Sequence, residues 1–169
     1  MDDGCVAMLL RLLILRQKTG DESPGSWKDP PIPPRFSPFP RGLYLPHGWR
    51  WRAMACTSGD DRFLLLGQVN INRGNYKGWL LHHHADQWRL LARIEDHASH
   101  AGLHAHAHCG DVLPNPGPAS VNAPVRRPIG RPSRRTAQGR SADAFWAQAC
   151  TIYRIGQLST IAKQGTLGL

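Results

Sequence analysis

The sequence predicts a small α+β protein, in which an antiparallel β-meander of four to five strands is covered by one C-terminal helix. Four apolar segments of strand length follow one another between residues 49 and 95, with short turns between them. One further segment near the C-terminus has apolar residues at helical spacing. With 169 residues, of which 41% are hydrophobic, the chain is long enough to bury one core.

Residues 1–45 are expected to form a disordered, proline-rich leader. Seven of the 14 prolines lie between Pro24 and Pro40, and such a run favours the extended polyproline conformation over hydrogen-bonded structure. The apolar run 6–15 is interrupted by Arg11 and is too short to span a bilayer. Because the four cysteines are widely spaced, with no paired motif, we expect a protein of the reducing cytoplasm without a membrane attachment.

The folded domain is expected to span residues 46–155, and it begins with four strands. Tryptophan and arginine alternate in the first, which is typical of a half-buried strand. The second is apolar on both sides at its start, and the fourth has one apolar and one mostly charged face. Residues suited to tight turns separate the strands, so neighbours are expected to pair antiparallel. The expected strands are 49–56, 63–71, 76–82 and 88–95.

The C-terminal part of the chain is expected to contain a long loop and one helix. Residues 111–140 hold six prolines and six arginines without hydrophobic periodicity, which predicts a basic, proline-rich loop. Ser141 is suited to cap a helix over 142–155, and Gly156 is placed to end it. The apolar face of this helix would cover the meander. Residues 156–169 are expected to form a frayed tail.

A dense group of histidines carries the main chemical signal of the sequence. Five of the nine histidines lie within residues 97–108, and three more occupy positions 82–84. Imidazole is the commonest metal ligand among side chains, and it titrates near neutral pH. In a strand over 103–109, His104 and His106 would share one face at a spacing of about 7 Å, close enough to bind one ion.

We therefore predict a transition-metal site, with zinc as the ion and with His104 and His106 as the first two ligands. A third ligand would come from His97, His100 or His108. Glu95 is the candidate proton acceptor that would make such a site hydrolytic instead of structural. A helix would also gather imidazoles on one face, but Gly102 and the preceding strand pattern favour a strand. A polar strand without a chemical role is the alternative to a site.

A basic stretch, residues 124–140, predicts a different function. The chain carries a net charge of +9, and residues 112–142 contribute six arginines and no acid to it. Gly130-Arg131-Pro132 resembles the second half of an AT-hook, a short basic segment that binds the minor groove of A·T-rich DNA, with Ile129 in place of the first core arginine. The resemblance implies a nucleic-acid-associated accessory protein. The candidate contacts are Arg126, Arg127, Arg131, Arg134 and Arg135.

Two further interpretations stay open at this point. The histidines would also suit a metal-independent nuclease, in which two imidazoles act as general acid and base. The basic stretch would equally suit a solvated linker without a specific target. The sequence contains no phosphate-binding glycine loop and no nucleophile elbow, so neither chemistry is supported by an established motif.

Overall fold

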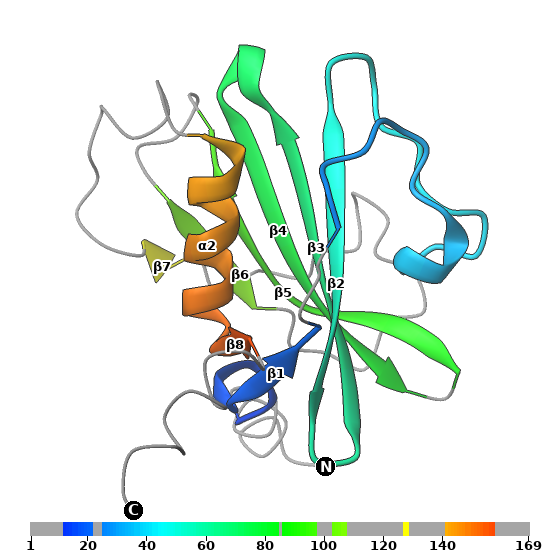
Figure 1. Cartoon of the computed structure of the whole chain (residues 1–169), viewed down its shortest axis with the longest axis vertical. Coiled ribbons are helices and arrows are strands. Elements are labelled where there is room, and N and C mark those ends of the chain that lie inside the picture. Colours follow the sequence, from blue (N-terminus) through cyan, green and yellow to red (C-terminus); the bar gives the residue numbers. More distant parts are fainter. Residues whose placement is uncertain are drawn as a thin grey trace, which may run out of the picture.

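A computed structural model describes residues 12–21, 25–84, 86–97, 103–107, 127–128 and 141–157, with the backbone alone described at 104–107, 127–128 and 157. These residues form one sheet of eight strands in the order β7-β6-β5-β4-β3-β2-β1-β8. Helix α2 (Ala142–Ile152) packs against one face of this sheet (Figure 1). The predicted combination of a β-sheet and a covering C-terminal helix is therefore confirmed.

The four long strands lie at the centre of the sheet, and each pairs antiparallel with the next. Gly59 and Gly74 adopt positive φ in the first two connections, and Asp86 does so in the third. The strands extend into polar residues such as Asp61 and His84, because backbone pairing does not require apolar side chains. The four strands are β2 (Arg50–Ser58), β3 (Asp61–Asn70), β4 (Asn75–His84) and β5 (Gln87–Asp96).

The prediction of a purely antiparallel sheet of four to five strands is wrong, because short strands extend both edges. On one edge, β1 (Lys18–Gly20) pairs antiparallel with β2 and parallel with β8 (Ile155–Gln157). On the other edge, β6 (His104–Ala107) pairs antiparallel with β5, and β7 (Arg127–Pro128) pairs antiparallel with β6. Strands of two to four residues are too short to show a hydrophobic period, so the sequence pattern does not reveal most of them.

The helix begins where the sequence predicts and ends earlier. The Ser141 hydroxyl oxygen accepts a hydrogen bond from the Ala144 amide at 3.0 Å, which confirms Ser141 as the N-cap. The helix stops at Ile152, and Arg154 then takes a left-handed conformation with φ of 54°. Gly156 does not end the helix, because it lies within β8. The chain therefore turns at Arg154 and returns to the sheet.

The expectation of a disordered leader over 1–45 is wrong for the parts of this segment that the structure describes. Ile32 and Leu45 are 1% and 6% exposed, and they pack with Trp51 and Leu66. Alternation along the strands places these side chains on the face of the sheet opposite α2. Proline-rich chain can dock in this way because an extended segment buries side chains without joining a continuous ladder.

Some predicted boundaries fall outside the described residues. The basic loop 111–140 is described only at β7, and the tail 156–169 only at its first two residues, which belong to β8. The domain limits of 46–155 stay a prediction. The described residues also include helical residues at 12–15 and two short 3-10 helices, η1 (Pro34–Phe36) and η2 (Ile71–Arg73). Within the described ranges, no helix has the length and apolar character that crossing a membrane requires.

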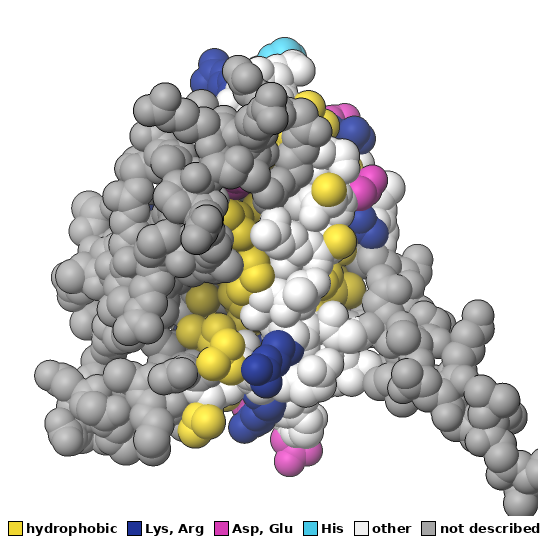
Figure 2. All heavy atoms as spheres, turned by 90° about the vertical axis from the view of Figure 1, so that its left-hand side faces the viewer, with side chains coloured by type: hydrophobic (Ala, Val, Ile, Leu, Met, Phe, Trp, Pro, Cys, Tyr) yellow, Lys and Arg dark blue, Asp and Glu magenta, His cyan; other side chains and the backbone are white. Residues whose placement is uncertain are grey.

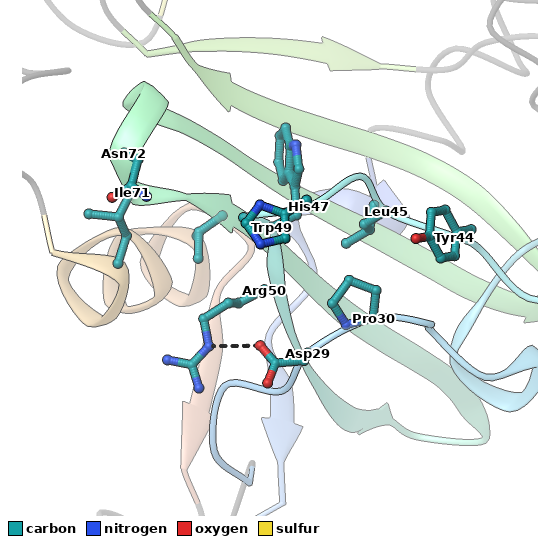
Figure 3. Close-up of a pocket in the computed structure, with 11 residues that line it drawn as sticks. Asp29, Pro30, Tyr44, Leu45, His47, Trp49, Arg50, Ile71 and Asn72 are labelled. Atoms are coloured by element: carbon teal, nitrogen blue, oxygen red, sulfur yellow. Dashed lines mark ion pairs between the residues drawn. The ribbon is translucent and has the colours of Figure 1, made fainter.

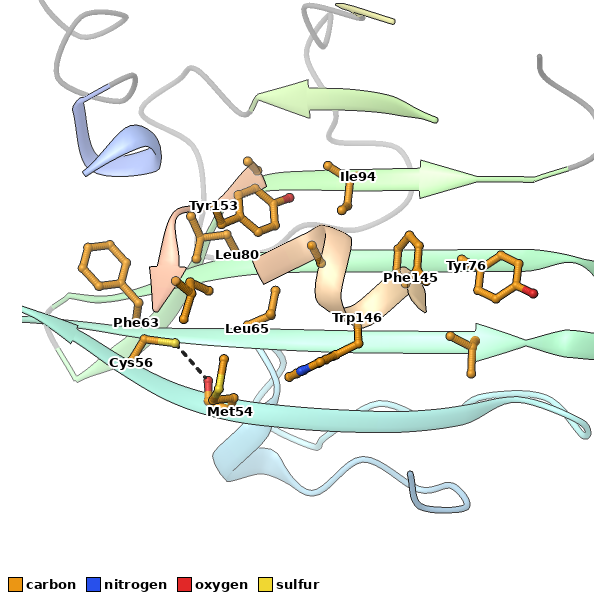
Figure 4. Packing of buried hydrophobic residues seen from close by; sticks show 14 of the residues in the cluster. Met54, Cys56, Phe63, Leu65, Tyr76, Leu80, Ile94, Phe145, Trp146 and Tyr153 are labelled. Carbon is orange, nitrogen blue, oxygen red and sulfur yellow. Dashed lines mark hydrogen bonds between the residues drawn. The ribbon is translucent and has the colours of Figure 1, made fainter. Parts of the chain in front are cut away.

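The main core lies between α2 and the sheet (Figure 4). Phe145 and Trp146 from the helix pack on apolar side chains of β2 to β5. Gly67 permits this close approach, because a Cβ atom there would lie 2.9 Å from the Trp146 ring. The Tyr153 hydroxyl donates to the Gly78 carbonyl oxygen at 3.0 Å, which satisfies a buried polar group. Hydrophobic side chains also reach the surface on the side of the molecule seen in Figure 2.

Candidate functional site

The end of β5 brings the predicted residues Glu95 and His97 into one pocket. The end of β5 pairs with the start of β4, so that Lys77 lies opposite Glu95. The pocket has a volume of about 270 Å³, and we call it the carboxylate pocket. It is lined by Trp49, Asn75, Tyr76, Lys77, Glu95 and His97.

The two oxygens of the Glu95 carboxylate have different neighbours. Oε1 lies 3.8 Å from Lys77 Nζ and 3.5 Å from Arg93 Nε, whereas Oε2 lies 3.9 Å from His97 Nε2. Glu95 is only 7% exposed, and a buried carboxylate requires such partners to stay ionised. The Lys77 ammonium also lies 5.6 Å from the centre of the Trp49 ring. The pocket therefore combines a carboxylate, an imidazole and the Lys77 ammonium, and the Arg93 guanidinium lies beside the carboxylate.

The register of β6 places the histidine segment beside this pocket. The Cα atom of His104 is the partner of Glu95, and that of His106 is the partner of Arg93. Directly opposed residues of an antiparallel pair have Cα atoms about 4.5–5.5 Å apart. The preference for a strand is confirmed over His104–Ala107. Of the other predicted ligands, His97 lies in the pocket, and His100 and His108 are outside the described residues.

The three histidines at 82–84 lie at the opposite end of β4 and do not join this site. His82 Nε2 is 3.0 Å from Asp61 Oδ1, and Arg16 pairs with the other carboxylate oxygen. The hydrogen bond with His82 is the main reason why the pKa of Asp61 lies below its ordinary value. His83 packs edge-on against the Trp88 ring. These contacts give the group a structural role near the β4–β5 turn.

The basic stretch reaches the sheet next to the histidines. In β7, Pro128 is the register partner of His104, and Arg127 is the partner of Ala105. Arg126, Arg131, Arg134 and Arg135 lie outside the described residues. A strand of two residues, such as β7, is too short to show a hydrophobic period, so the sequence pattern does not reveal that this segment pairs with the sheet. The two features that the sequence predicts separately, histidines and basic stretch, thus meet at one sheet edge.

A second and larger pocket was not expected from the sequence. It has a volume of about 580 Å³, and Tyr44, His47 and Trp49 line it, so we call it the aromatic pocket (Figure 3). Asp29 and Arg50 form an ion pair of 3.7 Å on its wall. Asp29 and Tyr44 come from the segment predicted to be disordered, which is why sequence reasoning missed the pocket. Trp49 lines both pockets.

The described cysteines do not contribute reactive thiolates. Cys56 and Cys150 are free, and burial raises the pKa of the Cys56 thiol to about 12 and that of Cys150 to about 11. Because the thiolate is the nucleophile and the metal ligand, both thiols are inert near neutral pH.

The described side chains alone do not form a complete metal centre. No group of three histidine, cysteine, aspartate or glutamate side chains within them is arranged to hold an ion. Glu95 and His97 supply two potential ligands, and the backbone position of His104 makes it the nearest candidate for a third.

No protein-family profile matches the sequence, and no curated protein or solved structure is significantly similar to it.

Proposed function

We propose that this chain carries a hydrolytic zinc site held by Glu95, His97 and His104. The register of β5 and β6 is the observation that carries the proposal, because it sets His104 opposite Glu95. Glu95 in turn precedes His97 by two residues in the sequence. Two histidines and one carboxylate are a ligand set of catalytic zinc, which keeps water in the fourth position. The 3.9 Å between Glu95 Oε2 and His97 Nε2 is near the roughly 3.3 Å between two ligands of a tetrahedral ion with bonds of about 2.0 Å.

His106 is a weaker ligand candidate than the sequence pattern suggests. Its register partner is Arg93, whose guanidinium cation lies 3.5 Å from Glu95. A second cation next to that guanidinium would be repelled. His100 and His108 stay predictions for a further ligand; if either replaced Glu95 at the metal, Glu95 would serve as the proton acceptor.

Lys77 and Arg93 give the site a preference for negative charge. Both cations lie on Oε1, and the other oxygen, Oε2, faces His97. Hydrolysis at a carbonyl or phosphoryl group builds negative charge on oxygen in the transition state, and preorganised cations stabilise that charge. This supports a hydrolytic role in preference to a structural one, because a structural site would not need two cations at its edge.

Metal-free acid–base chemistry is the second candidate, and the same two cations favour it. Lys77 and Arg93 already neutralise Glu95, so they oppose the approach of a divalent ion. In that case Glu95 orients the His97 ring, and the imidazole exchanges a proton with the substrate. The two candidates differ in one measurable property, the requirement for a metal.

The zinc content of purified, untagged protein tests the proposal. After dialysis we expect about one zinc ion per chain in the wild type, and less than about a tenth in His97→Ala and in His104→Ala. His84→Ala is the matched control, because His84 is an exposed histidine at the other end of β4 and should leave the zinc content unchanged. Circular dichroism checks that each variant is folded.

Two results would contradict the zinc proposal. A wild-type protein with less than about a tenth of a zinc ion per chain, even after incubation with zinc, has no such site, and the metal-free candidate takes its place. Equal zinc loss in the His84→Ala control and in His104→Ala would mean that the histidines bind the ion without a defined centre.

A further inference from the structure

We propose that the substrate of this site is single-stranded nucleic acid. The hydrolysis of this substrate rests on the proposed function, whereas its binding rests on Trp49, Tyr44 and Lys77, which are not proposed metal ligands. In the reaction, the oxygen of a water molecule bonds to phosphorus, one phosphodiester P–O bond breaks, and the released oxygen takes up a proton. Water is the only co-reactant, and the two products are shorter strands.

Two cations lie beside the candidate site, and the basic stretch enters the sheet next to it. Lys77 and Arg93 lie on the β4–β5 side, within 3.8 Å of the Glu95 carboxylate. On the other side, β7 sets Arg127 and Pro128 beside β6, and Pro128 is the register partner of His104. The sequence next to β7 carries four more arginines between residues 126 and 135 and no acid. A polyanion would therefore meet the Lys77 and Arg93 cations at the carboxylate pocket, next to the strand that carries the basic stretch into the sheet.

Carboxylates do not oppose a polyanion here. Among the described residues that line the two pockets, the acidic ones are Asp29 and Glu95. Asp29 pairs with Arg50 at 3.7 Å, and Glu95 pairs with both Lys77 and Arg93. Each negative charge in the lining is thus compensated by at least one cation. Neutralisation of phosphates by lysine and arginine is the main source of affinity for nucleic acids.

Aromatic rings make a single strand a better occupant than a duplex. Trp49 lines both pockets and is half-buried, and Tyr44 in the aromatic pocket is 77% exposed. Aromatic rings that line a pocket can stack on unpaired bases, which a duplex keeps inside its own stack. A pocket of about 270 Å³ also admits a single base and not a paired helix. The strand would pass from the aromatic pocket across Trp49 to the carboxylate pocket.

Binding in the presence of a chelator tests the inference separately from the metal. Fluorescence anisotropy is measured with labelled single-stranded RNA, single-stranded DNA and a DNA duplex, each in EDTA. We expect at least one of the single strands to bind more tightly than the duplex. Trp49→Leu, which keeps an apolar side chain and removes the ring, should weaken binding by about 5- to 150-fold if one base stacks there.

Two further variants sharpen the test. Trp88→Leu is the matched control, since Trp88 lies at the other end of β5, where its indole N–H donates to the Arg35 carbonyl oxygen. It should bind like the wild type. Lys77→Met should reduce the salt dependence of binding by about 0.7 in the slope of log K against log salt, as expected for one phosphate contact. This variant carries the test if Trp49→Leu does not fold.

Several outcomes would overturn the inference. They are absence of strand binding in EDTA, wild-type affinity in both Trp49→Leu and Lys77→Met, tighter binding of the duplex, and equal binding of polyglutamate, which would show a response to charge alone. If the wild type takes up no zinc after incubation with the ion but still binds the single strand, the proposed function is contradicted and this inference stands. Zinc binding without strand binding would do the reverse.

Discussion

At the scale of single residues, Lys18 is the most unusual group in the described chain. It is 1% exposed, and its ammonium donates hydrogen bonds to the carbonyl oxygens of Ile14, Arg16 and Tyr153 at 2.8–3.2 Å. Burial lowers the pKa of Lys18 from 10.5 to about 8, because it penalises the charged form. This one side chain links β1 to the residues before it and to the segment that follows α2.

The lowered pKa of Lys18 predicts a rise in stability between about pH 8 and pH 10.5. Below pH 8 the amine is protonated in both states, and the folded state bears the full cost of burying the charge. Between the two pKa values the unfolded chain binds a proton that the folded chain does not, so the free energy of unfolding rises by at most about 1.4 kcal/mol per pH unit.

Urea unfolding of wild type and Lys18→Met at pH 7.5, 8.5 and 9.5 checks this sign. The wild type should gain stability relative to Lys18→Met as the pH rises. Lys28→Met removes an exposed lysine and should track the wild type. Tyr153, whose pKa burial raises, is present in all three proteins and cancels in the comparison. Parallel curves for wild type and Lys18→Met would show that Lys18 stays charged.

At the scale of elements, α2 is held at its N-terminus by two kinds of contact. Ser141 caps the first turn, and Asp143 accepts hydrogen bonds from the Trp27 indole at 3.0 Å and from Arg52 at 3.2 Å. An acidic residue in the first turn also interacts favourably with the helix dipole. These contacts attach the helix both to β2 and to the segment before it.

Replacement of the cap should destabilise the whole fold. Ser141→Ala removes the oxygen that accepts from the Ala144 amide, and loss of such a cap costs about 1 kcal/mol. Ser26→Ala is the control, because Ser26 is an exposed serine outside any helix. Thermal unfolding followed by circular dichroism measures both. A midpoint for Ser141→Ala equal to that of the control would mean that water replaces the cap without cost.

The long elements were predictable from the sequence because each carries a local signal. Alternation marks β2 and β5, an apolar run marks β3, and a capping serine precedes α2. The short strands β1, β7 and β8 lack such a signal, since their pairing depends on residues far away in the chain. Gly156 illustrates the limit: glycine often ends a helix, but here the parallel pairing with β1 decides its position.

At the scale of the whole molecule, the candidate site was predictable in part. Glu95 and His97 lie two residues apart in the sequence, and strand spacing predicted that His104 and His106 share one face, with His97 among the candidates for a third ligand. The other residues around the site come from distant parts of the chain. Lys77 lies on β4, Trp49 precedes β2, and part of the aromatic pocket comes from the proline-rich segment, so only the folded sheet brings them together. The docking of that segment on the second sheet face is a tertiary effect that overrides its local preference for extended, unpaired chain.

The sheet edge formed by β5, β6 and β7 joins the two chemical features of the sequence. Glu95, His104 and Pro128 occupy successive positions across these strands, so the histidine segment and the basic stretch both reach this edge. Under the two proposals made above, nucleic-acid binding and hydrolysis are parts of one function instead of alternatives. The central claim of this account is that Glu95, His97 and His104 bind one metal ion.

Titration of metal-free protein with cobalt(II) tests that claim most directly. Four-coordinate cobalt absorbs visible light much more strongly than the hydrated ion, so its spectrum reports the coordination geometry. We predict intense bands that saturate at about one ion per chain, are lost in Glu95→Gln and His104→Ala, and persist in His84→Ala. A spectrum that stays that of the hydrated ion, or that is identical in all four proteins, would contradict the claim.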